Sequence, residues 1–529
     1  MRRWLGAGAV LVAAIAVLII AVAGAGTPGS GPASQTATTT VPAGSGPAPG
    51  AGRPRTIRIG ASTTGAPVRP GFLGFSFEFQ AVRSYTGSNP AAINPVLVQL
   101  IRNLTPGQAP VIRIGGDSTD VSWVPTPGVP APSYVSYRLS PSWLATTAAL
   151  ARLLGARMTM GINLAAHEPA LAGAEARAFL RSFGSGTLAA LEIGNEPNVY
   201  AKIQILHTLL GAPLYARPRD YGYPAFRREY LAEAAALPPI PAWGPALAVG
   251  PTPLPGSWIN TIPDFLRRNP GVTTMTVHRY PLRNCFVAPD SPQYPSVPHL
   301  LAPYATVGLA AGLRPWIARA HAQHRALRVD ELNSVACRGK AGVSDVFASA
   351  LWVTDALFSL VHARVDGVDL HTLPHSAYEL FAFSRDAATW QASVKPVYYG
   401  LELFAQAAPA GARLLPVAGG TRMPGLSVWA TRAPNGTVRT VLINKSTRSD
   451  RTVNLRPPAG LAATATIERL RGPSVHARGH ITLGGATYGP DTSSGRLATV
   501  HVTAVRGGSA GYTVVVPHAS AALVTFAPR

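Results

Sequence analysis

Short apolar runs alternate with longer amphipathic segments between residues 71 and 370. The longer segments, such as 145–154 and 345–360, have the apolar spacing of helices that cover a core on one side. Each apolar run ends in polar loop residues, which is typical of strands buried on both faces of a parallel sheet. Eight such units predict an α/β fold, a (β/α)8 TIM barrel, with strands at 71–80, 111–114, 158–162, 188–193, 246–249, 272–277, 326–329 and 365–370.

Beyond about residue 404 the pattern changes to short strands separated by Gly, Pro, Asn and Asp turns, for example 426–431, 437–443 and 512–516. This pattern predicts a C-terminal all-β sandwich over residues 404–529, after a catalytic barrel over residues 55–403. The alternating segment 56–59 precedes the first barrel strand and fits either the barrel or the sandwich.

The N-terminus has the pattern of an export segment. Arg2 and Arg3 precede an uninterrupted apolar run over residues 4–26. Residues 1–26 are therefore predicted to be a signal peptide or, because the run approaches the roughly 20 residues that span a bilayer, an N-terminal membrane anchor. Residues 27–54 are rich in Gly, Pro, Ser and Thr without apolar periodicity, which predicts a disordered linker. Either alternative makes the protein extracellular, secreted or held at the cell surface.

The composition indicates that the chain can form a large core and carries a strong positive charge. Of the 529 residues, 47% are apolar and 13% are charged, so the chain can bury the cores of more than one folded unit. The formal net charge of +22 comes almost wholly from arginine and favours anionic partners such as acidic polysaccharide, nucleic acid or membrane headgroups. We see no basic helical stripe and no aromatic-interleaved basic repeat, and we therefore expect no nucleic-acid partner.

The two cysteines, Cys285 and Cys337, follow the sixth and seventh predicted strands. In an exported chain they predict one disulfide between the loops after these strands, with two buried free thiols as the alternative. Neither cysteine resembles part of a metal cluster, and His321 and His324 have no third ligand in spacing. The sequence therefore predicts neither a metal site nor a cofactor.

Two glutamates stand in matching positions along the predicted barrel. Glu196 follows the fourth strand in an Asn-Glu-Pro motif, and Glu331 follows the seventh strand. Both would lie at the barrel mouth, where catalytic residues collect. A retaining glycosidase needs one carboxylic acid to protonate the leaving oxygen and one carboxylate to attack the sugar, about 5 to 5.5 Å apart. The pair therefore predicts such an enzyme, with two surface loop carboxylates as the alternative.

Five motifs, taken in order, resemble glycoside hydrolase family 79. This is the β-glucuronidase and heparanase-like family within the large clan of retaining barrel hydrolases, and the resemblance spans most of residues 56–529. The Asn-Glu-Pro motif is shared across the clan, whereas the ordered set with its trailing sandwich is more specific. The motifs are Gly74-Phe75-Ser76-Phe77-Glu78, Arg113-Ile114-Gly115-Gly116-Asp117-Ser118, Gly194-Asn195-Glu196-Pro197-Asn198, His278-Arg279-Tyr280-Pro281 and Glu331-Leu332-Asn333-Ser334.

The resemblance implies that Glu196 is the acid/base and Glu331 the nucleophile. Asn195 would donate a hydrogen bond to the sugar 2-hydroxyl, and Tyr280 would hydrogen-bond Glu331. The remaining predicted substrate-binding residues are Glu78, Asp117, Asn163, His278, Tyr378 and Arg338, and the resemblance implies this role for Glu78 and Tyr378. The alternative for Glu78 is a core-edge carboxylate paired with an arginine, and for Asp117 and Asn163 it is hydrogen bonding at the mouth without substrate contact.

A uronic acid substrate needs arginine, tyrosine hydroxyls or backbone amides to hold its carboxylate. Tyr378, after the eighth strand, matches a family position that contacts this group. The loop 335–340 departs from the relatives because it lacks a tyrosine, so carboxylate recognition shifts to Arg338 or to loop amides.

The favoured hypothesis is an exported retaining β-glucuronidase that acts on a glucuronide or an acidic glycan. The first alternative keeps the chemistry but changes the substrate, to an endo-acting heparanase-like enzyme or to a neutral-sugar arabinofuranosidase or xylosidase. The second alternative is a cell-surface carbohydrate-binding protein without turnover, which would not require the acid and nucleophile pair.

Overall fold

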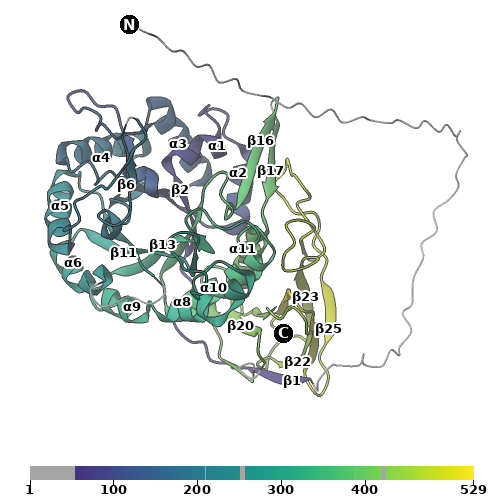
Figure 1. Ribbon diagram of the computed structural model, residues 1–529. Coiled ribbons are helices and arrows are strands. Elements are labelled where there is room, and N and C mark those ends of the chain that lie inside the picture. The colour runs from purple at the N-terminus through teal and green to yellow at the C-terminus, as the bar shows by residue number, and fades with distance from the viewer. Residues whose placement is uncertain (1–53, 209, 251–256, 388, 420–422) are drawn as a thin grey trace, which may run out of the picture. The chain divides into compact units, whose positions relative to one another are not determined.

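The computed structural model describes residues 54–529 except 209, 251–256, 388 and 420–422. Eight parallel strands close into a barrel, each strand pairing with the next along the chain and the last with the first (Figure 1). The predicted TIM barrel is confirmed, and each predicted strand segment overlaps one of these strands. The strands are β2 (Leu73–Glu78), β3 (Val111–Gly115), β6 (Arg157–Ile162), β7 (Leu188–Ile193), β10 (Ala242–Ala248), β11 (Val272–Arg279), β13 (Ala326–Leu332) and β15 (Gly367–Thr372).

Helices pack around the barrel, and capping residues fix where several of them begin. The Asn94 side chain accepts hydrogen bonds from two backbone N–H groups at the start of α2 (Pro95–Leu104). The Ser140 side chain accepts one hydrogen bond from a backbone N–H group at the start of α3 (Pro141–Leu154). Both helices begin with proline, whose missing N–H costs no hydrogen bond there. The other helices are α1 (Val82–Thr86), α4 (Pro169–Phe183), α5 (Tyr223–Ala236), α6 (Ile262–Arg268), α7 (Val297–Leu301), α8 (Val307–Ala311), α9 (Arg314–His321), α10 (Ala348–Ala363) and α11 (Pro396–Ala407).

The structure differs from the prediction at the ends of two barrel strands. Strand β10 begins at Ala242, before the predicted segment 246–249. The sequence pattern missed this first half because Gly244 and Pro245 in the middle of the strand have the pattern of a turn. The register with β11 shifts at this point. Strand β2 is shorter than the predicted segment 71–80, since the chain turns after Glu78 into the 3-10 helix η1 (Phe79–Ala81).

Two β-sheets follow the barrel and confirm the predicted C-terminal β domain. One sheet has the order β19-β1-β22-β26, and the other has the order β18-β20-β21-β27-β23-β24 with β25 beside β23. Strand β1 (Arg55–Ile59) pairs in parallel with β22, so the segment 56–59 lies in the sandwich, where Ile57 is part of the core. The other strands are β18 (Arg413–Leu414), β19 (Val417–Ala418), β20 (Leu426–Arg432), β21 (Val438–Asn444), β22 (Arg451–Arg456), β23 (Thr464–Arg471), β24 (Thr482–Leu483), β25 (Thr503–Arg506), β26 (Tyr512–Val516) and β27 (Ser520–Phe526).

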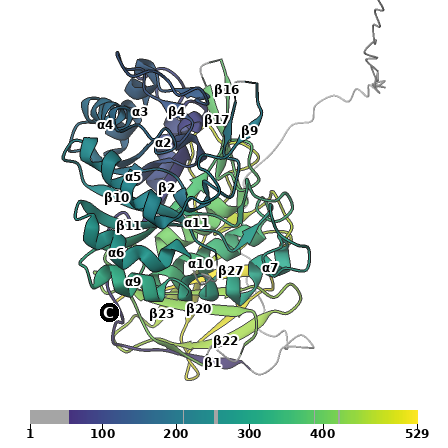
Figure 2. The ribbon, with the colours of Figure 1, turned by 60° about the vertical axis from the view of Figure 1, so that its left-hand side comes forward.

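A buried carboxylate on α10, Asp355, ties the barrel to the sandwich. It accepts hydrogen bonds from Ser427 Oγ at 2.8 Å, Trp429 Nε1 at 2.7 Å and Lys445 Nζ at 2.6 Å. The three donors lie on β20 and directly after β21, and α10 and β20 lie side by side in both views (Figures 1 and 2). Charge-assisted hydrogen bonds to one buried carboxylate fix these two elements against each other.

Additional short strands extend the loops around the barrel. Strand β12 (Leu282–Arg283) pairs with β14 (Val335–Ala336), and the disulfide Cys285–Cys337 joins the two loops, with the Cα atoms 6.0 Å apart. The predicted disulfide is thereby confirmed. The remaining short strands form the pairs β4 (Ser122–Trp123) with β5 (Tyr137–Arg138), β8 (Leu206–His207) with β9 (Pro213–Leu214), and β16 (Phe381–Asp386) with β17 (Thr389–Val394).

The predicted export segment, residues 1–26, and the predicted linker up to residue 53 lie outside the described residues. Within the described part of the chain, no helix combines the length and the apolar character needed to cross a membrane.

Glu402 on α11 is expected to make the stability depend on pH. Burial raises its pKa from 4.5 to about 7; Tyr488, which donates a hydrogen bond at 2.8 Å, opposes this shift, and Glu468 adds to it. Because the folded state binds this proton more tightly than the unfolded chain, the stabilisation is full below pH 4.5 and is lost as the pH rises through 7. The whole effect is about 3 kcal/mol. We expect the melting temperature to fall less between pH 5 and pH 8 in Glu402→Gln than in the wild type; equal falls would contradict the assignment.

Candidate active site

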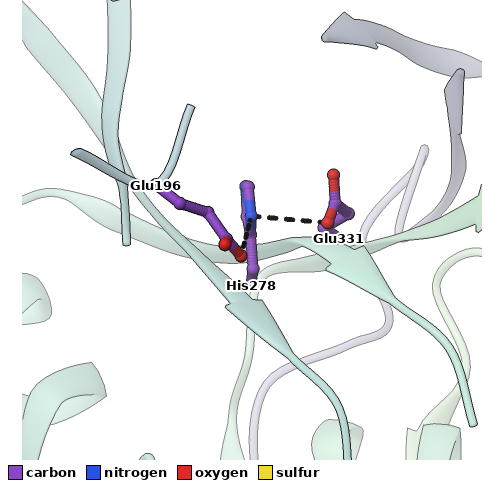
Figure 3. A group of neighbouring side chains, drawn as sticks. All are labelled: Glu196, His278 and Glu331. Carbon is purple, nitrogen blue, oxygen red and sulfur yellow. Dashed lines mark hydrogen bonds and ion pairs between the residues drawn. The ribbon is translucent and has the colours of Figure 1, made fainter. Parts of the chain in front are cut away.

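The C-terminal ends of β7, β11 and β13 bring three predicted site residues together. Glu196 follows β7 with a left-handed backbone (φ 51°), directly before the 3-10 helix η3 (Pro197–Val199). His278 and Glu331 are the last residues but one of β11 and β13. One ring nitrogen of His278 and one carboxylate oxygen of each glutamate lie within 4.8 Å of one another. Figure 3 shows the imidazole between the two carboxylates, with contacts to both. The two glutamates therefore belong to one site.

Arg113, in the middle of β3, lies at the centre of this site and is fully buried. Its Nε donates to Glu192 Oε2 at 2.6 Å, and its Nη1 donates to Glu331 Oε1 at 2.9 Å. Its Nη2 donates to Asn195 Oδ1 at 3.0 Å and contacts His278 Nε2 at 3.3 Å. One guanidinium therefore contacts side chains that lie on or directly after three other barrel strands, β7, β11 and β13.

The environment of Glu331 keeps it ionised. Burial by itself would raise the pKa of Glu331, but His278, His371 and Arg113 outweigh it electrostatically. A hydrogen bond from the Tyr280 hydroxyl to Oε2, at 3.0 Å, also favours the charged form. Together these groups lower the pKa to about 2. Glu331 is therefore a carboxylate at neutral pH, as a nucleophile must be.

The contacts of His278 indicate which ring nitrogen carries the proton. Arg113 can only donate, so a neutral ring accepts at Nε2 and carries its proton on Nδ1, and a protonated ring carries a proton on Nδ1 as well. Nδ1 lies 2.9 Å from Glu196 Oε1 and 3.4 Å from Glu331 Oε2. The Nδ1–H of His278 is thus shared between the two carboxylates.

Asn195 is held by two neighbours at the mouth. Its Oδ1 accepts from Arg113, and its Nδ2 donates to Asp117 Oδ1 at 3.2 Å. Asp117 is exposed at the mouth, yet protein atoms crowd around it. This desolvation, and then the negative charges of Glu78 and Glu196, raise the pKa of Asp117 well above its usual range. The orientation of the Asn195 amide is therefore set before any ligand binds.

Glu78 and Tyr378 line the side of the site formed by β2 and β15. Glu78 is buried and accepts hydrogen bonds from the backbone N–H groups of Asp117 at 3.1 Å and Ser118 at 2.8 Å, and from the Ser118 hydroxyl. It thus caps the 3-10 helix η2 (Asp117–Thr119). The buried ring of Tyr378 packs against His371 at 5.7 Å and Tyr280 at 6.3 Å between centroids.

The structure does not bring Asn163 into this group, and Arg338 lies at its edge. Asn163 is buried, donates to the Ser122 carbonyl at 2.9 Å and accepts from the Ala166 N–H at 3.0 Å. These contacts match hydrogen bonding without substrate contact. Arg338 is exposed, with a left-handed backbone (φ 67°), and its carbonyl accepts from the Ala377 N–H at 2.9 Å, next to Tyr378.

Sequence reasoning missed three polar residues that hold the site. Arg113 interrupts an otherwise apolar strand, a signal that could have marked it, whereas the strand of His371 also contains Asp369 and Thr372. The third is Asp120, whose carboxylate accepts from the Tyr200 hydroxyl at 2.6 Å and from the Asn195 N–H at 3.3 Å. Asp120 lies in a loop, and only the folded chain reveals its contacts.

The three side chains in Figure 3 also carry the donor atoms of a metal site, a nitrogen and two carboxylate oxygens. Both oxygens of Glu331 already accept hydrogen bonds, from Arg113 and from Tyr280. The guanidinium charge at 2.9 Å would repel a divalent cation bound there. The arrangement therefore suits a divalent metal ion poorly.

The sandwich carries a recognisable family signature. Residues 428–523 match the glycosyl hydrolase family 79 C-terminal beta domain. The chain thus contains a family 79 β domain. This match confirms the predicted resemblance over the sandwich. No curated protein sequence matches the chain.

Solved structures resemble the chain over both the barrel and the β domain. A 4-O-α-L-rhamnosyl-β-D-glucuronidase from Fusarium oxysporum 12S is 19% identical, with a TM-score of 0.68 and coverage of 89% of this chain and 99% of that one. Two family 51 arabinofuranosidases are also similar. The one from Xanthomonas axonopodis pv. citri has 16% identity, a TM-score of 0.61 and coverage of 89% and 100%. The one from Bifidobacterium longum has 14% identity, a TM-score of 0.60 and the same coverage. The fold is that of TIM-barrel glycosidases, and with the family match it indicates a glycosidase.

Proposed function

We propose that the protein is a retaining β-glucuronidase that releases glucuronic acid from glycosides or glycan ends. The observation that carries the reaction is the closeness of Glu196 and Glu331, which have carboxylate oxygens within 4.8 Å. Retaining glycosidases separate their carboxyl groups by about 5 to 5.5 Å, whereas inverting enzymes need about 6.5 to 9.5 Å to admit a water molecule. The family 79 match and the likeness to a β-glucuronidase support the sugar.

In the first step, a Glu331 oxygen attacks the anomeric carbon while the bond from that carbon to the leaving oxygen breaks. Glu196 gives its proton to the leaving oxygen, and the sugar becomes an ester of Glu331. The low pKa of Glu331 supplies the ionised nucleophile. Asn195, held by Arg113 and Asp117, would donate to the 2-hydroxyl, a contact that strengthens in the transition state.

In the second step, a water molecule attacks the anomeric carbon and passes its proton to Glu196. The ester bond breaks and Glu331 regains its charge. The negative charge thus moves from Glu331 to Glu196 in the first step and returns in the second. The shared N–H of His278 lies 2.9 Å from one carboxylate and 3.4 Å from the other, so it can follow this charge without a large movement.

We infer that Tyr378 and the loop 337–339 hold the uronate carboxylate. Tyr378 is buried against Tyr280, whose hydroxyl binds the nucleophile. The positive charge of Arg338 acts on Tyr378, and the backbone of Gly339 lies so close to Tyr378 N that a Cβ would be 2.8 Å from it. A tyrosine hydroxyl beside an arginine gives the donors that a carboxylate needs.

Release of 4-nitrophenol from four glycosides tests the sugar. We expect the full-length protein to hydrolyse the β-glucuronide and to leave the β-glucoside, β-xyloside and α-arabinofuranoside intact. Hydrolysis of the arabinofuranoside alone would keep the two-glutamate chemistry and reject the uronic acid, an outcome that the arabinofuranosidase neighbours make the second candidate. No hydrolysis of any of the four would contradict the proposed exo-acting enzyme.

Two substitutions at His278 test the shared N–H. Asparagine can place an amide N–H where Nδ1 was, whereas glutamine places its N–H nearer to the former Nε2. We expect His278→Asn to keep kcat/KM within about tenfold and His278→Gln to lose about 100-fold, since hydrogen bonds to charged groups contribute about 1.5–3 kcal/mol. Without the donor the pKa of Glu331 should rise, so His278→Gln should lose relatively more activity at pH 4 than at pH 7. Equal losses and unchanged pH profiles would assign His278 only a packing role.

We further propose that the protein acts outside the cytoplasm. The apolar run over residues 4–26 and the disulfide Cys285–Cys337 support this location, since disulfides persist in oxidising compartments.

A further inference from the structure

A second cavity lies at the end of the barrel opposite the catalytic glutamates. It has a volume of about 410 Å3 and is lined by the connection before β2, the end of α9 and the segment between α10 and β15. Ala326, the first residue of β13, lines it, whereas Glu331 is five residues further along the same strand. At about 3.3 Å per residue the two sites are roughly 16 Å apart. The cavity is therefore separate from the site described above.

The lining of this cavity is unevenly charged. Arg69, Arg325 and Arg364 face a single carboxylate, Asp366. Asp366 is already engaged, because Arg69 Nη2 lies 2.9 Å from Oδ1 and His321 Nε2 lies 2.7 Å from Oδ2. Among the described residues, neither Arg325 nor Arg364 has a carboxylate within ion-pair distance. The cavity thus offers positive charge that no acidic side chain of the described part balances.

Two basic residues of the lining occupy backbone positions that favour glycine, as His167, Arg338, His375 and His480 do elsewhere in the described chain. Arg364 (φ 71°) ends α10, and His324 (φ 56°) ends the turn after α9. Both helices close with a hydrogen bond from the next N–H back to a carbonyl five residues earlier, the arrangement in which the left-handed residue is usually glycine. Helix α3 closes in the same way and uses Gly155 (φ 59°). The chain therefore accepts strained basic residues at the two helix ends that line the cavity.

Helix dipoles alone do not account for this choice. A cation near a helix C-terminus is favourable anywhere in the last turn. Helix α3 has such a cation, Arg152, and still keeps glycine in the left-handed position. The basic side chains at positions 324 and 364 both line the cavity, whereas Arg152 does not.

We propose that this cavity binds an oxyanion, a sulfate or phosphate group carried by a small molecule. Guanidinium groups donate paired hydrogen bonds to such oxygens, and a volume of about 410 Å3 falls within the range of small-molecule sites. Arg325 and Arg364 would bind the anion directly. Arg69 and His321 would stay on Asp366, which keeps the wall of the cavity in place.

Thermal unfolding of the full-length protein tests the proposal. The probes are inorganic sulfate, inorganic phosphate and glucose 6-sulfate at low millimolar concentration, with chloride at matched ionic strength and glucose as the uncharged control. We expect a saturable rise of the melting temperature of roughly 2–4 °C with the oxyanions and none with chloride or glucose. A larger rise with glucose 6-sulfate than with inorganic sulfate would identify a sugar-borne anion, and equal rises a free one. No saturable rise with any probe would reject the site.

Three variants make the test specific. Arg364→Gly suits the left-handed backbone, so it should melt at or above the wild-type temperature without an anion and lose the anion-induced rise. His324→Asn, which also tolerates this conformation, should reduce the rise and serves if the first variant does not fold. Arg152→Gln removes a matched helix-end charge outside the cavity and should keep the full rise. An equal rise in all variants would mean that the anion acts on the general surface, and the proposal would be wrong.

Discussion

Glu331→Gln should lower kcat on 4-nitrophenyl β-glucuronide by at least about a thousandfold, which corresponds to about 4 kcal/mol of lost transition-state stabilisation. Glutamine keeps the size of the side chain and can still contact Arg113 and Tyr280, but it cannot form the sugar ester. KM should change little, because binding does not depend on the attacking charge. Steady-state kinetics with the wild type as reference measure both quantities.

Glu196→Gln is the matched control, because it removes the acid and leaves the nucleophile. Loss of general acid catalysis costs about 100-fold to 10,000-fold. With a nitrophenyl leaving group, which needs little protonation, the rate of the first step should fall less than the rate of the second step. A burst of nitrophenol followed by slow turnover is therefore expected from this variant and not from Glu331→Gln.

Addition of azide separates the two roles further. In Glu331→Ala the small anion should attack in place of the nucleophile and give the α-glycosyl azide, whereas in Glu196→Ala it should attack the sugar ester and give the β-azide. Residual turnover of Glu331→Gln above about a tenth of the wild-type value would reject the nucleophile assignment. Exchanged anomers of the two azides would instead mean that the acid and the nucleophile are interchanged.

Arg113→Met should destabilise the protein by about 3–5 kcal/mol, because it leaves buried carboxylates without their counter-ion. The guanidinium lies 2.6 Å from Glu192, 2.9 Å from Glu331 and 3.3 Å from Asp330. Burial, and then the charge of Glu192, raise the pKa of Asp330 well above its usual range, whereas Arg113 helps to lower the pKa of Glu192 and of Glu331. Without the arginine the pKa of Glu331 should rise, so the remaining activity should shift to higher pH.

Arg113→Lys tests whether charge or geometry matters at this position. Lysine retains the charge but cannot donate to Glu192, Glu331 and Asn195 at once. We therefore expect Arg113→Lys to lower the melting temperature less than Arg113→Met does and to lower kcat by a similar factor. The double variant Arg113→Met with Glu192→Gln should recover part of the stability lost in the single variant. A stable and active Arg113→Met would show that this buried network does not support the site.

The barrel was predictable because its strands are buried on both faces and therefore appear as apolar runs. Strand β10 is the exception at its first half, where Gly244 and Pro245 give a local turn pattern that the barrel context overrides. The hairpin of β16 and β17 was not predicted either. It lies in the connection after β15 and leaves most of its residues partly or fully exposed, so it lacks an apolar pattern.

The two glutamates were predictable because strand ends of a barrel converge, and the sequence marks those ends. Which neighbours they meet depends on side-chain direction, and this explains the different outcomes for Glu78 and Asn163. Both follow or end strands, but Glu78 caps the turn at Asp117, whereas Asn163 holds the Ser122 carbonyl. The contacts of Arg113 could not be predicted, because they depend on the registers of several strands at once, and the spacing of residues along the sequence does not give these registers.

Strand β1 has a consequence for how the chain acquires its fold. Its partner is β22, with Arg55 opposite Val453. The first strand of the described chain can therefore pair only after a strand near the C-terminal end has been synthesised. During synthesis the sandwich sheet cannot close until the whole barrel has been translated, and β1 presents an unpaired edge for that time. The β domain therefore cannot be transplanted as one continuous stretch of sequence. A fusion or truncation that omits residues 55–59 would remove an inner strand of its smaller sheet.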